Sequence, residues 1–249
     1  IRLSAYLALT VALLPIQALA VLTRTRASKY TPIFYHRLCA KIFGFRIRVN
    51  GSPSAARPTL FVSNHVSYMD ITVLGSLLDA SFIAKAEVSK WPLFGQLAKL
   101  DRTVFVQRRG PRAAEQRDEI SGRLSDGDNL ILFPEGTSAD GLHVLPFKSS
   151  LFSVAEHRGQ SDSLALQPVS ISYTQLDGIP LGRCLLPHFA WYGEMTMVPH
   201  LFTLVGLGFV TIEVTFHEPA LSHEFQSRKD MAEYCHRIVS AGASRSNQA

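Results

Sequence analysis

The chain has 249 residues, which fits one α/β domain of ordinary size together with an attached segment. Apolar side chains make up 47% of it and charged ones 18%, so it is rich in hydrophobic surface for a soluble enzyme. The net charge of +5 is uneven, because residues 1–69 hold nine Lys and Arg and no Asp or Glu. A basic region beside an apolar segment favours membrane lipids over nucleic acid as its partner. The three cysteines form no CxxC pair, which argues against a structural zinc site or a disulfide framework.

Residues 3–22 form an uncharged, mostly apolar stretch, long enough as a helix to cross the hydrocarbon layer of a bilayer. We interpret this stretch as a retained membrane anchor, since Arg24, Arg26 and Lys29 follow it directly and are typical of a cytoplasmic flank. Two alternatives remain open. A signal peptide could end at Ala18-Leu19-Ala20, and a buried core helix would be kinked by Pro15.

Residues 30–43 mix aromatic and basic side chains and predict a second helix at the membrane interface. Short apolar runs then alternate with helical patterns, which predicts an α/β fold with a mixed, mostly parallel sheet flanked by helices. We therefore expect a membrane-anchoring helical segment at 1–43, a globular domain at 44–243 and a flexible tail at 244–249. The expected strands are 45–49, 59–63, 82–85, 103–107, 129–133, 164–173 and 210–216, and the expected helices are 71–78, 112–124, 151–156 and 228–240. Residues 195–209 are apolar but too few to span a bilayer, so they predict an interfacial element, a wall of the substrate groove or a core helix.

His65 and Asp70 follow the second expected strand in the segment Ser63-Asn64-His65-Val66-Ser67-Tyr68-Met69-Asp70. An imidazole takes up a proton near neutral pH, and a carboxylate can fix its tautomer, so the pair suits general-base chemistry. Two residues five apart on one helix do not meet, so His65 must lie in a turn before the helix begins. Ser67 and Asp70 have the spacing of a capping box, which predicts that helix start. Alternatively, the two residues only cap the helix, and His65 is an ordinary turn residue.

A second polar segment, Phe133-Pro134-Glu135-Gly136-Thr137-Ser138, follows another short buried strand. Glu135 could accept hydrogen bonds from a substrate hydroxyl, and Gly136 lets backbone N–H groups approach a charged ligand. An ordinary turn is the alternative. The related serine-hydrolase pattern GxSxG is incomplete here, because Asp140 occupies the position of its last glycine.

These segments resemble the glycerolipid acyltransferase family, specifically bacterial 1-acylglycerol-3-phosphate acyltransferases, over roughly residues 45 to 220. Four blocks occur in the family's order. They are Asn64-His65-x-Ser67-x-x-Asp70 (the H-x4-D motif), Val104-Phe105-Val106-Gln107-Arg108, Phe133-Pro134-Glu135-Gly136-Thr137 and Gln167-Pro168-Val169.

The resemblance implies an acyltransferase domain at 44–243 that moves a fatty acyl group without a covalent acyl-enzyme. His65 would deprotonate the acceptor hydroxyl, and Asp70 would orient His65. A headgroup-binding set would comprise Arg108, Glu135, Gly136 and Thr137. The acyl donor would be acyl-CoA or acyl carrier protein, with no cofactor or metal ion. The enzyme would act at the cytoplasmic face of the bacterial inner membrane.

Ser138 departs from the family, which usually has an arginine after the threonine of the third block. A phosphate acceptor would lose one cationic partner there. The first expectation is therefore 1-acylglycerol-3-phosphate as acceptor, with phosphatidate as product, and the alternative is a lyso-ornithine lipid or another lysolipid. A non-catalytic membrane lipid-binding protein is an alternative of another class, but binding alone does not need the His65–Asp70 pair.

Overall fold

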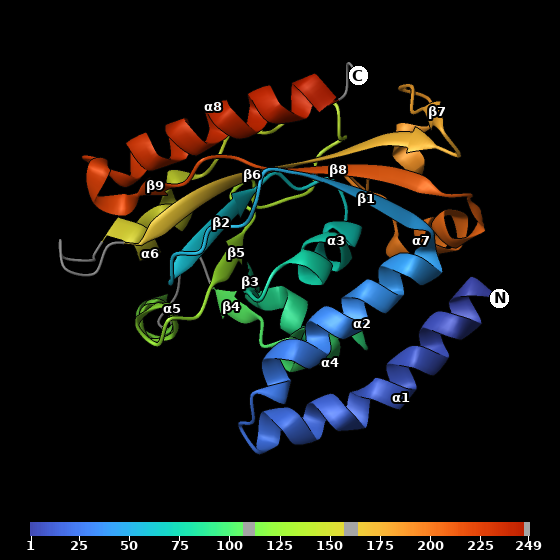
Figure 1. The fold of residues 1–249 in the computed structure, drawn as a ribbon, viewed down its shortest axis with the longest axis horizontal. Coiled ribbons are helices and arrows are strands. Elements are labelled where there is room, and N and C mark those ends of the chain that lie inside the picture. The colour runs from blue at the N-terminus through green and yellow to red at the C-terminus, as the bar shows by residue number, and fades with distance from the viewer. Residues whose placement is uncertain (107–112, 157–163, 247–249) are drawn as a thin grey trace.

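The strands form a mixed sheet in the order β1-β8-β6-β2-β5-β3-β4, with β7 and β9 pairing to β6 (Figure 1). The computed structural model describes residues 1–106, 113–156 and 164–246. Within these residues the pairs β1–β8, β2–β5, β2–β6, β3–β4 and β3–β5 are parallel, whereas β6 runs antiparallel to β7, β8 and β9. The expected mixed, mostly parallel sheet is confirmed. The strands are β1 Phe45–Asn50, β2 Thr59–Ser63, β3 Ser81–Lys85, β4 Val104–Val106, β5 Leu130–Leu132, β6 Ala165–Leu176, β7 Ile179–Pro180, β8 Val210–Phe216 and β9 Ala220–Leu221.

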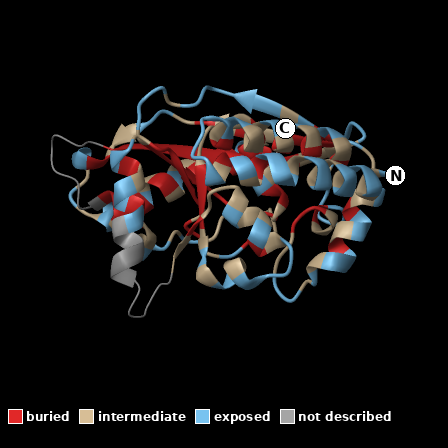
Figure 2. Ribbon diagram, turned by 90° about the horizontal axis from the view of Figure 1, so that it is seen from below, coloured by how far each residue is buried: buried red, intermediate tan, exposed pale blue. Residues whose placement is uncertain are grey.

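Helices cover both faces of this sheet, with α8 on one face and α1 to α4 on the other (Figure 1). Figure 2 shows buried strands between helices whose outer faces are exposed. The central strands β2 and β5 are buried along their whole length, which explains why their sequences are continuous apolar runs without alternation. The helices are α1 Arg2–Leu22, α2 Ala27–Phe43, α3 Met69–Leu77, α4 Phe94–Leu100, α5 Ala113–Ser125, α6 Ser153–Glu156, α7 Met197–Gly206 and α8 Arg228–Ser246, with 3-10 turns at Ala86–Lys90, Ser149–Phe152, Leu186–His188 and Ser222–Glu224.

The C-terminal helix is longer than the sequence predicts. It continues to Ser246, so residues 244–246 are helical where a flexible tail was expected. Its last turns are held against β6. Gly242 packs there so closely that a Cβ atom would lie 2.4 Å from the hydroxyl of Ser170, and the Ser172 hydroxyl donates to the Ala243 carbonyl. Packing against the sheet stabilises a helix end that its polar sequence alone would leave frayed.

Helix α1 is long and apolar enough to cross a membrane and has few buried residues, so the core-helix alternative is wrong. Nevertheless, both of its ends are bound to the rest of the protein. The Arg2 guanidinium donates to the carbonyls of Leu207 and Gly208, and the buried Gln17 amide donates to the carbonyls of Ser28 and Leu100 at 3.1 and 2.7 Å. The helix therefore lies along the side of the domain.

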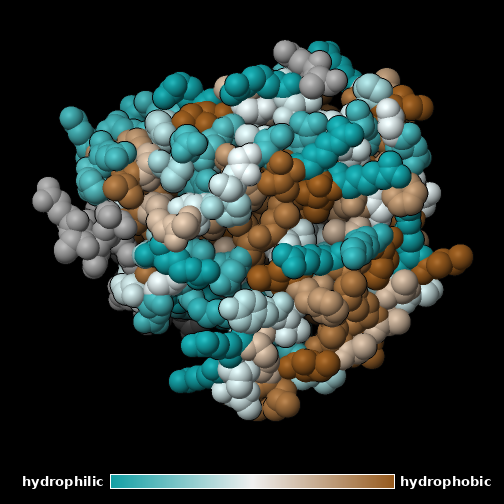
Figure 3. Space-filling model, in the orientation of Figure 1, coloured by the Kyte–Doolittle hydropathy of each residue, from teal (hydrophilic) through white to brown (hydrophobic). Residues whose placement is uncertain are grey.

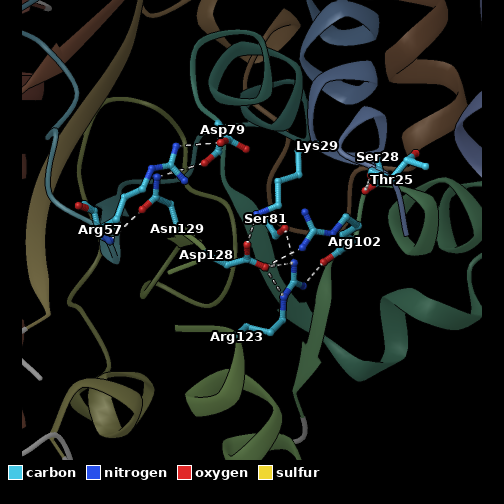
Figure 4. A network of polar contacts seen from close by, with 11 residues as sticks. Thr25, Ser28, Lys29, Arg57, Asp79, Ser81, Arg102, Arg123, Asp128 and Asn129 are labelled. Carbon is cyan, nitrogen blue, oxygen red and sulfur yellow. Dashed lines mark hydrogen bonds and ion pairs between the residues drawn. The ribbon is translucent and has the colours of Figure 1, made fainter. Parts of the chain in front are cut away.

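The start of α2 is fastened to the sheet through the Asp128 carboxylate (Figure 4). Lys29 approaches one oxygen of this carboxylate at 2.7 Å, and Arg102 and Arg123 approach the other at 2.6 and 3.2 Å. Burial disfavours the charge on Asp128, but its hydrogen bond to Lys29 and the two arginines together lower its pKa. The network lies at the end of the sheet where β3 and β5 begin, away from the H-x4-D loop at the carboxyl end of β2.

Candidate active site

The H-x4-D loop connects β2 to α3 and is fastened to the neighbouring strand β6. The Asn64 side chain makes a paired contact with one residue of that strand. It donates to the Ile171 carbonyl at 2.9 Å and accepts from the Ile171 N–H at 2.8 Å. Because Asn64 ties this loop to β6, His65 emerges at a defined place beyond the end of β2.

His65 and Asp70 meet, as expected from a helix that starts only after His65. The imidazole Nδ1 lies 2.9 Å from Asp70 Oδ2, and the same oxygen accepts from the backbone N–H groups of Val66 and Ser67 at 2.7 and 2.9 Å. Only the acidic half of the expected capping box forms, because the Ser67 hydroxyl has no hydrogen-bond partner among the described residues. Asp70 thus organises the loop and the imidazole together.

Tyr173 on β6 completes the surroundings of Asp70 and was missed by the sequence reasoning. Its hydroxyl donates to Asp70 Oδ1 at 2.9 Å, and Asp70 itself is fully buried. Burial and the nearby carboxylate raise the pKa of Tyr173 well above its usual value, so the hydroxyl stays protonated and serves as the hydrogen-bond donor to Asp70. Nothing in the spacing of the sequence indicates this contact, which joins residues 103 positions apart.

The imidazole of His65 is held flat but partly open. It stacks on Phe133 with ring centroids 4.2 Å apart and planes 20° apart, and 19% of its side chain is exposed. With Nδ1 directed at Asp70, the tautomer with hydrogen on Nδ1 leaves Nε2 as the basic nitrogen. This arrangement can accept a proton from a hydroxyl that reaches Nε2.

Glu135 holds the H-x4-D loop against the second motif. Its Oε1 accepts from the His65 backbone N–H at 2.7 Å and its Oε2 from the Leu145 N–H at 2.8 Å, and only 1% of the residue is exposed. Burial raises the pKa of Glu135 to about 7, although its backbone hydrogen bonds act in the opposite direction. Since both oxygens already accept backbone donors, the geometry favours a positioning role for Glu135 over the expected direct contact with substrate.

The other residues of the expected headgroup-binding set are Gly136, Thr137 and Arg108, and the structure describes the first two. Gly136, with φ of +67°, makes the turn that returns the chain to the His65 carbonyl, which accepts from Ala139 N–H at 2.8 Å. Thr137 is exposed beside this turn. Arg108 lies outside the described residues, just beyond β4.

Ser138 does not face an open headgroup pocket, which corrects the expectation that its side chain enters the site. It is buried, and its hydroxyl donates to the Trp191 carbonyl. An arginine side chain at this position would have to displace that contact.

An apolar cavity of about 210 Å³ lies next to the loop, between the sheet and helices α1 to α4. Tyr68 and Met69 at the start of α3 belong to its wall, which links it to the His65–Asp70 pair. Its remaining wall is made by side chains such as Leu13, Tyr35, Phe43, Phe82, Phe94 and Leu97. The cavity can enclose hydrocarbon but offers little to a polar ligand.

Comparisons with known proteins agree with this architecture. The family described as "Acyltransferase" matches residues 46–172. The lyso-ornithine lipid O-acyltransferase of Brucella abortus (strain 2308) is 42% identical over 233 residues, 92% of this chain and 87% of that protein. The 1-acyl-sn-glycerol-3-phosphate acyltransferase of Neisseria gonorrhoeae is 32% identical, over 77% of this chain and 73% of that protein. The crystal structure of the LPA acyltransferase PlsC from Thermotoga maritima has the same fold, with a TM-score of 0.63, 24% identity and coverage of 98% and 97% of the two chains.

Proposed function

Because the chain belongs to the acyltransferase family, we propose that it is a lysolipid O-acyltransferase whose acceptor is a lyso-ornithine lipid. The main support for this acceptor is the 42% identity to the Brucella abortus protein of that name, and the Rhizobium meliloti (strain 1021) protein of the same name is 38% identical over 88% of this chain. The relative named for 1-acylglycerol-3-phosphate is less similar. The order of the two acceptors expected from the sequence is therefore reversed, and 1-acylglycerol-3-phosphate becomes the second candidate.

The contact of 2.9 Å between His65 and Asp70 supports the chemistry. In the proposed reaction, His65 Nε2 takes the proton of the acceptor hydroxyl while that oxygen attacks the thioester carbonyl carbon of the acyl donor. Asp70 stabilises the imidazolium that forms. Collapse of the tetrahedral intermediate breaks the carbon–sulfur bond, and the leaving thiolate takes the proton back from His65. The products are an ester and a free thiol of coenzyme A or carrier protein.

The apolar cavity would hold the fatty acyl chain during this reaction. Its wall approaches the catalytic loop at Tyr68 and Met69, and it extends from there towards α1, α2 and α4. An acyl chain bound there would place its apolar surface against side chains and keep it out of water.

The surface of α1 supports attachment to a membrane. Exposed Leu7, Val11, Leu19 and Leu22 lie along it, and Figure 3 shows apolar surface where α1 runs in Figure 1. Since both ends of α1 are bound to the domain, we propose that it lies in the plane of one leaflet, with the acyl cavity directly behind it. The cytoplasmic face of the bacterial inner membrane remains the expected location.

The test is acyl transfer by the purified protein. Lyso-ornithine lipid and 1-acylglycerol-3-phosphate would each be incubated with acyl-CoA and with acyl carrier protein, and the products read by mass spectrometry. We expect the doubly acylated ornithine lipid as the main product, and a loss of roughly 10²–10⁴-fold in His65→Ala. His223→Ala, which changes an exposed histidine elsewhere, is the matched control. A preference for 1-acylglycerol-3-phosphate would overturn the acceptor, and normal turnover by His65→Ala would overturn the mechanism.

A further inference from the structure

Three aromatic rings meet directly beside the catalytic loop. Tyr68 lies in that loop between His65 and Asp70, and the Trp191 backbone N–H donates to the Val66 carbonyl at 2.9 Å. The rings of Tyr68 and Trp191 have centroids 5.7 Å apart and planes at 76°. The rings of Trp91 and Trp191 are 6.3 Å apart at 81°. We call Tyr68, Trp91 and Trp191 the aromatic corner, because the ring plane of Trp191 is nearly perpendicular to the ring planes of the other two residues.

The aromatic corner is fixed in place by hydrogen bonds. The Tyr68 hydroxyl lies 3.0 Å from His200 Nδ1, and His200 Nε2 lies 3.1 Å from the Ala190 carbonyl oxygen. Trp191 is held through its backbone by the Val66 carbonyl and by the Ser138 hydroxyl. The serine that replaces the family's usual arginine therefore supports one ring of the corner.

The corner is also open to a ligand. The Trp91 residue is 37% exposed, and Tyr68 and Trp191 are half-buried. Tyr68 and Trp91 both belong to the wall of the acyl cavity, and Tyr68 also lies in the loop that carries His65. The faces of tryptophan and tyrosine rings attract cations, and sets of such rings bind ammonium groups in other proteins.

We propose that Tyr68, Trp91 and Trp191 bind the ammonium group of the acceptor headgroup. This inference rests on the proposed function. An ornithine that is acylated on one of its two amines keeps one ammonium group and one carboxylate, whereas 1-acylglycerol-3-phosphate has no ammonium group. The aromatic corner would thus select the first acceptor over the second. Arginine in place of Ser138 would remove the hydroxyl that donates to the Trp191 carbonyl and so remove a support of Trp191.

The experiment compares two acceptors that differ at one nitrogen, namely lyso-ornithine lipid with its charged ammonium group and the same lipid with that amine acetylated and therefore uncharged. Assays in micelles of an uncharged detergent avoid competing headgroups. We expect Trp91→Leu to lower kcat/KM for the free amine about 5- to 30-fold more than kcat/KM for the acetylated lipid, mainly through KM, because any effect of Trp91 on the acyl cavity is common to both acceptors. Trp91→Phe should give an intermediate loss, because the face of phenylalanine attracts cations less strongly. Phe34→Leu, which removes a ring of 54% exposure on α2, is the matched control and should affect neither acceptor.

Each contrary result has a distinct meaning. An equal loss for both acceptors in Trp91→Leu would overturn the proposal and assign the ring to membrane insertion or packing. Phosphatidylethanolamine added to the micelles should not compete with the acceptor. Competition as strong as that of the acceptor itself would overturn the assignment to the acceptor headgroup, since the corner would then bind ammonium lipids in general. If the wild-type protein acylated neither lipid, the proposed function itself would fail.

Discussion

Replacing Asp70 by asparagine and by alanine should have very different effects on folding and similar effects on catalysis. In Asp70→Ala, the buried donors of Val66, Ser67 and Tyr173 lose their acceptor. Each such loss costs about 1–3 kcal/mol, or roughly 3–9 kcal/mol together, which is comparable to the whole stability of a typical domain. In Asp70→Asn, the two backbone N–H groups would hold the amide carbonyl in the place of Oδ2. The amide NH₂ would then face the Tyr173 hydroxyl, which can accept a hydrogen bond as well as donate one.

We therefore expect the Asp70→Asn variant to fold, with a free energy of unfolding within about 1.5 kcal/mol of the wild-type value. Its kcat/KM should be lower than that of the wild type by roughly 10²–10⁴-fold. Chemical denaturation and measurements of kcat/KM test the two effects. Adding Tyr173→Phe to Asp70→Asn removes the acceptor of the amide NH₂, so the double variant should be less stable than either single variant. An Asp70→Asn protein as unstable as Asp70→Ala would refute the hydrogen-bond arrangement, and one with nearly normal activity would refute the role of the charge.

Three further predictions follow from other parts of the structure. Folding raises the pKa of Glu135 to about 7, so the folded protein binds the proton of this carboxyl group more tightly than the unfolded chain does. This tighter binding stabilises the protein at low pH, and the stabilisation is lost as the pH rises towards 7. The free energy of unfolding should thus fall by roughly 3 kcal/mol at most between pH 4.5 and 8, and Glu135→Gln should flatten this slope. Leu97 lines the cavity, so Leu97→Trp should narrow it and shift the products, identified by mass spectrometry, to shorter acyl chains. Leu93 is exposed, and the control variant Leu93→Trp should not change the acyl-chain length of the products. Deletion of residues 1–43 should release the protein from membranes or leave it poorly soluble. If the truncated protein still pelleted fully with membranes in high salt, the attachment would lie at residues 195–209 instead.

The local structure of this protein could be predicted from short-range patterns. Buried strands appear as short apolar runs, so β2, β5 and β8 were expected within one residue at each end. The five-residue spacing of His65 and Asp70 required a turn before the helix, and α3 does begin at Met69. Periodicity and spacing encode such features because they depend on neighbours within one or two turns of the chain.

The contacts within the site depend on the order of the strands in the sheet. This order brings together residues that lie far apart in the sequence, and no sequence pattern indicates that they meet. Pairing of β2 with β6 places Tyr173 on Asp70, which the H-x4-D motif alone does not indicate. Burial of Glu135 between two backbone donors favours support of the loop over the contact with substrate that the sequence suggested. Tyr68, Trp91 and Trp191 meet only in the folded chain. A side chain's partners across a sheet are set by which strands are neighbours, and that choice depends on packing of the whole domain.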